Sequence, residues 1–106
     1  MTILGVAVLA LPTAARADNP LYGRWQSMRG YMVTLLADNY AMWTESGGRY
    51  EGRWKSVGDS QFELNVPQLN FHHTCTYAIL NNGATLHITT CDTTGGLSQQ
   101  NLIQVK

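Results

Sequence analysis

The chain has 106 residues, of which 44% are hydrophobic and 13% charged. A chain of this length closes one hydrophobic core at most. Seven Lys and Arg residues balance seven Asp and Glu residues, so the protein has no positive surplus with which to attract nucleic acid or an anionic membrane.

The first residues have the pattern of a secretory signal peptide. An unbroken apolar run at 3–11 ends at Pro12, and the Ala-Arg-Ala sequence at 15–17 places small residues where a signal peptidase needs them. The run is much shorter than the roughly 20 apolar residues that span a bilayer. We therefore expect a signal peptide at 1–17, a single domain at 18–106, and a periplasmic or secreted protein with no stable membrane span once the leader is removed. The alternative is that the apolar run is a buried first element of the domain.

The rest of the chain alternates between apolar and polar residues, in segments separated by turn-forming clusters. The clearest segment is 49–57, where Tyr50, Gly52 and Trp54 share one side and Arg49, Glu51, Arg53 and Lys55 share the other. This period of two predicts a strand with one buried and one solvated face. The same pattern predicts eight strands, at residues 22–28, 31–37, 40–45, 49–57, 61–66, 74–80, 84–91 and 97–105.

The joints between these strands are nearly all of hairpin size, with one longer joint at 67–73. No segment keeps apolar residues at helical spacing over three turns. Successive hairpins build a meander, and closing the meander removes its two exposed edges. The sequence therefore predicts an all-β fold, a small up-and-down antiparallel barrel of about eight strands, with a sandwich or a partly open sheet as the alternative.

The sequence Gly-Arg-Trp occurs twice, at 23–25 and at 52–54. On a strand the Gly and the Trp share a face, and a Gly at such a place lets another backbone or an indole ring come close. The opening Leu21-Tyr22-Gly23-Arg24-Trp25 resembles the Gly-x-Trp first strand of lipocalins. Tyr50-x-Gly52-x-Trp54 with Gly58-Asp59, and later Asn82-Gly83-Ala84-Thr85-Leu86, is similar to the inner hairpins of small bacterial lipocalin-like domains. The resemblance implies a barrel of that kind.

Aromatic side chains are the candidate binding residues of such a barrel, because they combine a large contact area with a polar tip. They lead to our first hypothesis, an exported non-enzymatic module that binds a small apolar ligand in the barrel or at its mouth. Two alternatives stay open: the aromatics fill the core, or the protein stabilises the cell envelope without a dissociable ligand. The candidate ligand-binding residues are Trp25, Tyr31, Trp43, Tyr50, Trp54 and Tyr77.

A second resemblance predicts a different partner. Ser46-Gly47-Gly48-Arg49-Tyr50, followed by Trp54-Lys55 and Gly58-Asp59, resembles the Ser-Gly-x-x-Tyr loop and next strand of periplasmic inhibitors of C-type lysozyme. In that family the loop Ser and a nearby Lys enter the lysozyme cleft, which implies this role for Ser46 and Lys55, with Arg49 beside them. The alternative function is thus a protein inhibitor of a secreted hydrolase. The simpler interpretation of Ser-Gly-Gly is a turn that needs positive φ.

Cys75 and Cys91 flank one predicted hairpin, and two cysteines in an exported chain favour a disulfide. A two-residue turn at Asn82-Gly83 places Cys75 opposite Thr90, so that the cysteines face opposite sides. A disulfide therefore predicts a three-residue loop or a bulge near Thr74.

Neither a metal site nor an active site is expected. The cysteines and histidines suit zinc in kind, but the adjacent His72 and His73 would point to opposite faces if this part of the chain is extended, and no Cys-x-x-Cys pair occurs. The chain has no Gly-x-Ser-x-Gly, no Gly-rich phosphate loop and no His-Glu-x-x-His. We expect no metal, no cofactor and no enzymatic activity.

Overall fold

The computed structural model describes residues 19–92 and 97–105. The predicted signal peptide at 1–17 lies outside the described residues. The strands are β1 (Gly23–Ser27), β2 (Tyr31–Leu35), β3 (Tyr40–Glu45), β4 (Gly48–Ser56), β5 (Gln61–Val66), β6 (Phe71–Leu80), β7 (Thr85–Cys91) and β8 (Gln100–Val105). Two short 3-10 helices, η1 (Pro67–Leu69) and η2 (Asn81–Gly83), precede β6 and β7.

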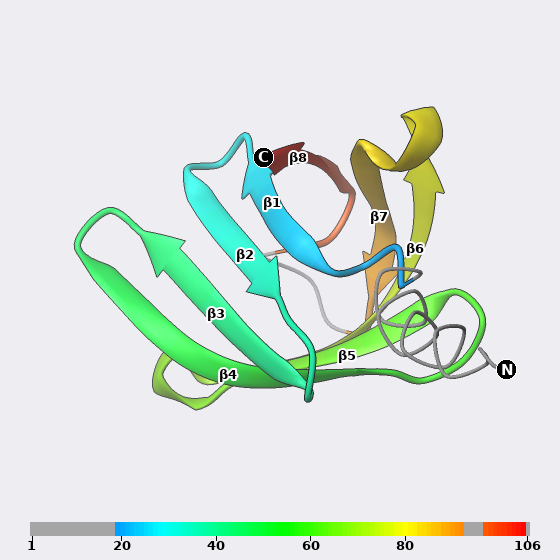
Figure 1. Ribbon diagram of the computed structural model, residues 1–106. Helices are drawn as coiled ribbons and strands as arrows, with labels where there is room; N and C mark the ends of the chain where they lie inside the picture. The colour runs from blue at the N-terminus through cyan, green and yellow to red at the C-terminus, as the bar shows by residue number, and fades with distance from the viewer. Residues whose placement is uncertain (1–18, 93–96, 106) are drawn as a thin grey trace, which may run out of the picture.

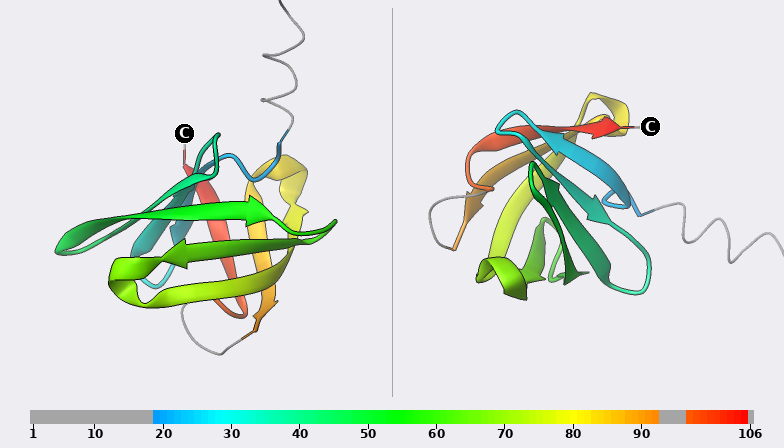
Figure 2. Two further views of the ribbon diagram at one scale, coloured as in Figure 1. Left: turned by 90° about the horizontal axis from the view of Figure 1, so that it is seen from below. Right: turned by 90° about the vertical axis from the view of Figure 1, so that its left-hand side faces the viewer.

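The eight strands form a closed antiparallel barrel in chain order (Figure 1). Each strand pairs with the next, and β1 also pairs with β8, with Arg24 opposite Val105 and Ser27 opposite Leu102. Figure 2 shows the sheet curving round until β8, in red, lies beside β1, in blue. The predicted all-β, up-and-down barrel is confirmed in its closed form. The described residues contain no helix with the length and apolar character of a membrane span.

β3 and β5 begin and end at the predicted residues, and β4 is shifted by one residue from the predicted 49–57. The prediction was wrong for β6, which begins at Phe71 and so takes in three residues assigned to a long joint. The chain reverses more tightly than expected after Pro67, because Asn70 adopts a left-handed conformation with φ 55° and its N–H donates to the Pro67 carbonyl oxygen at 2.9 Å. His72 is therefore a strand residue.

The core lies inside the barrel and follows the predicted alternation. Along β4, Gly52 and Trp54 are buried while Arg53 and Lys55 are exposed. Along β5, Phe62, Leu64 and Val66 are buried. The inner side of the sheet thus holds the apolar side chains, and the charged side chains of β4 lie on its outer side.

The two Gly-Arg-Trp copies need glycine for different reasons. A Cβ at Gly52 would collide with the backbone carbonyl oxygen of Asn65 on β5, which confirms the expected close approach of another backbone. At Gly23 a Cβ would meet only the side chain of Gln104, at 3.0 Å, but the φ of 138° favours glycine. Both tryptophans are buried, and each indole N–H donates to a backbone carbonyl oxygen, Trp25 to Leu21 at 3.0 Å and Trp54 to Leu36 at 2.9 Å.

A disulfide joins Cys75 on β6 to Cys91 on β7. Leu80 pairs with Thr85 across a four-residue connection, which by parity would leave Cys75 opposite Thr90. The register shifts between Thr76 and Tyr77, and this irregularity brings Cys75 directly opposite Cys91. The predicted disulfide and bulge are confirmed, with the bulge slightly nearer the hairpin tip than Thr74, whereas the three-residue loop is not found.

Candidate functional site

The six aromatic residues predicted to bind a ligand all belong to the barrel core or pack against it. Tyr31 stacks on Trp43 with ring centroids 4.3 Å apart and an interplanar angle of 16°. Trp43 in turn lies 5.3 Å from Phe71, which comes from β6, three strands away in the barrel. These rings contact one another, as core side chains do, and their assignment to a ligand site stays a prediction. Trp25, Tyr31, Trp43 and Trp54 are buried, and Tyr50 and Tyr77 are partly buried.

Hydrogen bonds between side chains occupy the end of the barrel near the β1–β2 turn. The Tyr31 hydroxyl accepts a hydrogen bond from Nε2 of Gln100 at 2.6 Å, and Ser27 Oγ donates to Oε1 of the same Gln100 at 2.7 Å. Burial raises the pKa of Tyr31, against the opposing effect of hydrogen bonds with Ser27 and Gln100. This end of the interior is therefore filled by polar side chains that bind one another.

The residues predicted for an inhibitor loop lie at two separate places. Ser46 and Gly47 form an exposed two-residue turn between the paired residues Glu45 and Gly48, and Gly47 has a φ of 93°. The turn is the tip of the hairpin of β3 and β4 (Figure 1). Arg49 is exposed and follows Gly48 directly. Lys55 lies near the other end of β4, eight residues after Gly47 and thus about 26 Å from the turn at the usual rise of a strand. The fold thus brings Ser46 and Arg49 together and leaves Lys55 elsewhere.

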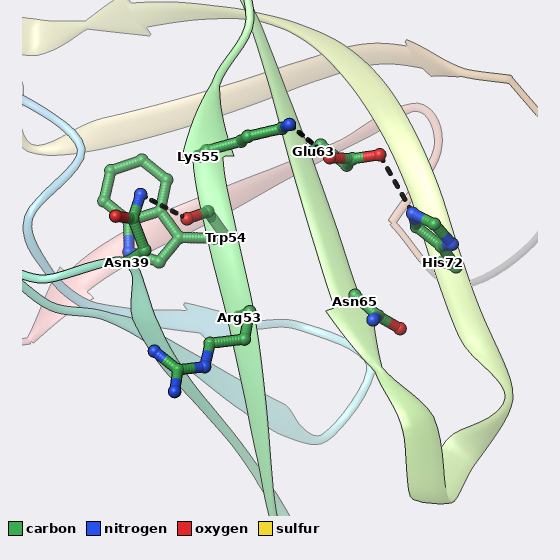
Figure 3. A pocket seen from close by; sticks show the side chains of 7 residues that line it. All are labelled: Asn39, Arg53, Trp54, Lys55, Glu63, Asn65 and His72. Atoms are coloured by element: carbon green, nitrogen blue, oxygen red, sulfur yellow. Dashed lines mark hydrogen bonds and ion pairs between the residues drawn. The ribbon is translucent and has the colours of Figure 1, made fainter.

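A hollow of about 430 Å³ lies over the outer side of β4, β5 and β6, and we call it the outer groove (Figure 3). Strand register assembles it, because Arg53 pairs with Asn65, Asn65 pairs with His72, and Lys55 pairs with Glu63. Paired residues project to the same side of a sheet, so these side chains share the outer side. The lining residues are Asn39, Arg53, Trp54, Lys55, Glu63, Asn65 and His72.

The turn between β2 and β3 forms one wall of the outer groove. Asp38 and Asn39 both have a φ of 63°, a left-handed conformation that Asn and Asp tolerate better than most residues. The Asn39 carbonyl oxygen accepts a hydrogen bond from the Trp54 N–H at 3.0 Å, and Asn39 Nδ2 donates to the Trp54 carbonyl oxygen at 2.9 Å. Because the Trp54 indole also bonds Leu36, this wall is held to β4 at three points.

Glu63 lies between two basic side chains of the outer groove. One of its oxygens is 3.6 Å from Lys55 Nζ and the other is 2.9 Å from His72 Nε2. The hydrogen bond with His72 is the main cause that lowers the pKa of Glu63, and the Lys55 charge acts in the same direction. Arg53 extends away from Glu63 (Figure 3) and reaches the Asp38 carbonyl oxygen at 3.5 Å. The groove thus combines two permanent cations, one histidine and one carboxylate.

Most of these residues were not candidates from sequence. Trp54 was a candidate ligand-binding residue, Lys55 was named for the inhibitor loop, and Arg53 was assigned only to a solvated face. The predicted strands at 49–57 and 61–66 follow each other across a short joint, so Lys55 and Glu63 were already placed on neighbouring strands. The residue that could not be placed was His72, because the start of β6 was predicted three residues too late.

The histidines near the cysteines pair with carboxylates. His72 contacts Glu63, and His73 Nδ1 lies 3.1 Å from Asp92 Oδ1. Both cysteines belong to the disulfide. Among residues 19–92 and 97–105, no three His, Cys, Asp or Glu side chains gather as a metal site requires.

A small closed eight-stranded antiparallel barrel is the kind of fold that the resemblance to lipocalins implies. The resemblance to lysozyme inhibitors adds a hairpin tip, and Ser46 and Arg49 do lie at one. Both resemblances rest on short motifs. Comparison with family models, with curated proteins and with solved structures finds no match for this chain.

Proposed function

We propose that the protein is an exported, non-enzymatic binding module of the lipocalin-like kind, and that its binding site is the outer groove. The observation that supports this most is the preformed wall, in which Asn39 is bonded twice to Trp54 and faces charged residues of β4 and β5. Binding sites are usually concave and largely formed before the ligand arrives. The lining favours a polar ligand over the apolar one expected from the aromatic residues, of which Tyr31 and Trp43 stack on each other in the core.

Binding accounts for the groove better than catalysis. A general base works best with a pKa near the working pH, whereas the pKa of Glu63 is lowered and its carboxylate is already engaged by two partners. A periplasmic or extracellular location fits the disulfide, since such bonds persist in oxidising compartments.

Thermal unfolding with a panel of sugars, amino acids and organic acids tests the proposal, because a ligand that binds only the folded state raises the midpoint. At least one polar compound should stabilise the wild type, and Arg53→Ala should lose the effect. Arg49→Ala is the matched control, since Arg49 is exposed on the same strand but outside the groove. The proposal fails if no compound stabilises the wild type, or if both variants respond like the wild type.

The exposed Ser46-Gly47 turn favours a second candidate, a protein inhibitor of a secreted hydrolase such as C-type lysozyme. A short hairpin tip can enter an enzyme cleft without rearranging the barrel. Excess protein should slow lysis of bacterial cells by lysozyme, Ser46→Ala should abolish the effect, and Ser56→Ala should retain it. An unchanged lytic rate with excess wild-type protein eliminates this candidate.

A further inference from the structure

We propose that the outer groove binds an oxyanion, the carboxylate or phosphate group of a polar ligand, between Arg53 and Lys55, and that Glu63 competes with this ligand in the free protein. The inference rests on the proposed function and names the chemistry of the ligand.

Arg53 and Lys55 supply the positive charge. They are two residues apart on β4, so both side chains project to the outer side of the sheet. Within the described residues, the Arg53 guanidinium donates to the Asp38 carbonyl oxygen at 3.5 Å, a long distance for a hydrogen bond. A guanidinium group binds carboxylate and phosphate through paired N–H donors, so its main bonding capacity is left for a ligand.

Other groups around the two cations are suited to an anion as well. Asn65 pairs with Arg53 on β5 and carries an amide donor, and His72 lies next to Asn65 on β6. The wall at Asn39 is fixed by its bonds to Trp54, so that it needs no rearrangement when a ligand enters. A fixed wall lowers the entropy lost on binding.

Glu63 already makes one of the contacts that an incoming oxyanion would make, the contact with Lys55. Its carboxylate approaches Lys55 Nζ at 3.6 Å and His72 Nε2 at 2.9 Å. The Lys55 side chain is 60% exposed, and exposed ion pairs of this kind are weak. An anionic ligand can therefore displace Glu63 from Lys55, but the negative charge of Glu63 opposes the approach of that ligand. Removing that charge should strengthen binding.

The test is a titration of the full chain with inorganic phosphate and, separately, with acetate, at constant ionic strength. Backbone amide shifts of Arg53, Lys55 and Glu63 report the binding. Glu63→Gln should bind about twofold to fivefold more tightly than wild type, the range that follows from the strength of exposed ion pairs. Arg53→Ala and Lys55→Ala should bind about threefold to tenfold more weakly. Arg24→Ala, which removes an exposed arginine of β1, should bind like wild type.

Several results would overturn the inference. One is a Glu63→Gln variant that binds no more tightly than wild type, and another is an Arg24→Ala variant that weakens binding as much as Arg53→Ala does. A third result is that neutral compounds raise the unfolding midpoint of the wild type but not of Arg53→Ala, while neither phosphate nor acetate changes the amide shifts. In that case the oxyanion inference fails and the proposed function stands. A response to phosphate or to acetate supports the inference, and their relative strength identifies the preferred group. Unfolding curves for each variant confirm that it is folded.

Discussion

Nε2 of His72 lies 2.9 Å from Oε2 of Glu63, and this contact connects the outer sides of β6 and β5. It is the main cause that holds the pKa of Glu63 below its ordinary value, with Lys55 on the neighbouring strand adding to it. The folded protein therefore favours the ionised carboxylate in the middle of the outer groove.

Replacing His72 should raise the pKa of Glu63. In His72→Ala the carboxylate loses its hydrogen-bond partner, so its pKa should rise toward the ordinary glutamate value, as followed by NMR of the side-chain carboxyl carbon. His87→Ala is the control, because His87 bonds Asn101 on another part of the barrel. An unchanged Glu63 titration in His72→Ala would contradict the assigned cause.

The same shift predicts how the contribution of Glu63 to stability depends on pH. The pKa of Glu63 is lowered in the folded protein, so ionised Glu63 stabilises the fold at pH values above the ordinary glutamate pKa of about 4.3. This contribution disappears as the pH falls through the lowered pKa. Glu63→Gln should thus be less stable than wild type at neutral pH, with the difference closing toward acid. Denaturant unfolding at a series of pH values measures it, and a difference that widens in acid is the contrary result.

Gly52→Ala should destabilise the barrel strongly. The new methyl group would collide with the carbonyl oxygen of Asn65, a backbone atom that cannot move without disturbing the pairing of β4 and β5. Overpacking of this kind costs about 1–3 kcal/mol, measurable as a lower free energy of unfolding in urea. Ser56→Ala, at the exposed end of the same strand, should change it little. A Gly52→Ala variant as stable as wild type would show that the strands can separate freely here.

Asn39→Asp should loosen the groove wall while preserving the shape of the turn. Asp tolerates the left-handed conformation nearly as well as Asn, but it has no N–H to donate to the Trp54 carbonyl oxygen. The loss should be about 1 kcal/mol in the free energy of unfolding, with faster amide hydrogen exchange at Trp54. Asp38→Asn makes the reverse change at the neighbouring residue with the same φ and should have little effect. An Asn39→Asp variant that is as stable as the wild type, or one that loses no more stability than Asp38→Asn, would contradict the role assigned to this hydrogen bond.

Reduction of the disulfide should lower the free energy of unfolding by about 3 kcal/mol in the chain-entropy model, since the bond closes a loop with a sequence separation of 16. Urea unfolding with and without a reducing agent measures the change. The double variant Cys75→Ala/Cys91→Ala should reproduce it, and adding the reducing agent to that variant should have no effect. A reduced wild type as stable as the oxidised protein would contradict this prediction.

Local pattern was enough to predict most of the barrel. The alternation along β4 and β5 identifies their buried faces because each strand has one face on the core, and two cysteines that must share a face require a bulge or an odd loop. The start of β6 was missed because a left-handed Asn70 shortens the turn after Pro67, and residue types alone do not distinguish that turn from a longer loop.

The outer groove depends on long-range register and was not predicted. Asn39 reaches Trp54 only through the pairing of β3 with β4, in which Tyr40 lies opposite Arg53, and His72 meets Glu63 only through the pairing of β5 with β6. Polar residues on a solvated face carry no periodic signal that separates a binding site from ordinary surface.

The pairing of β1 with β8 has a consequence for how the protein forms. Trp25 lies beside Gln104, so the first strand of the barrel obtains its second neighbour from the last strand of the chain. Such distant pairing makes folding slow, because a long loop must close before the contact forms. Until β8 is available, the backbone of β1 is an open edge to which a strand of another chain can add. Chains shortened before β8 should therefore exchange strands or aggregate instead of forming a smaller barrel.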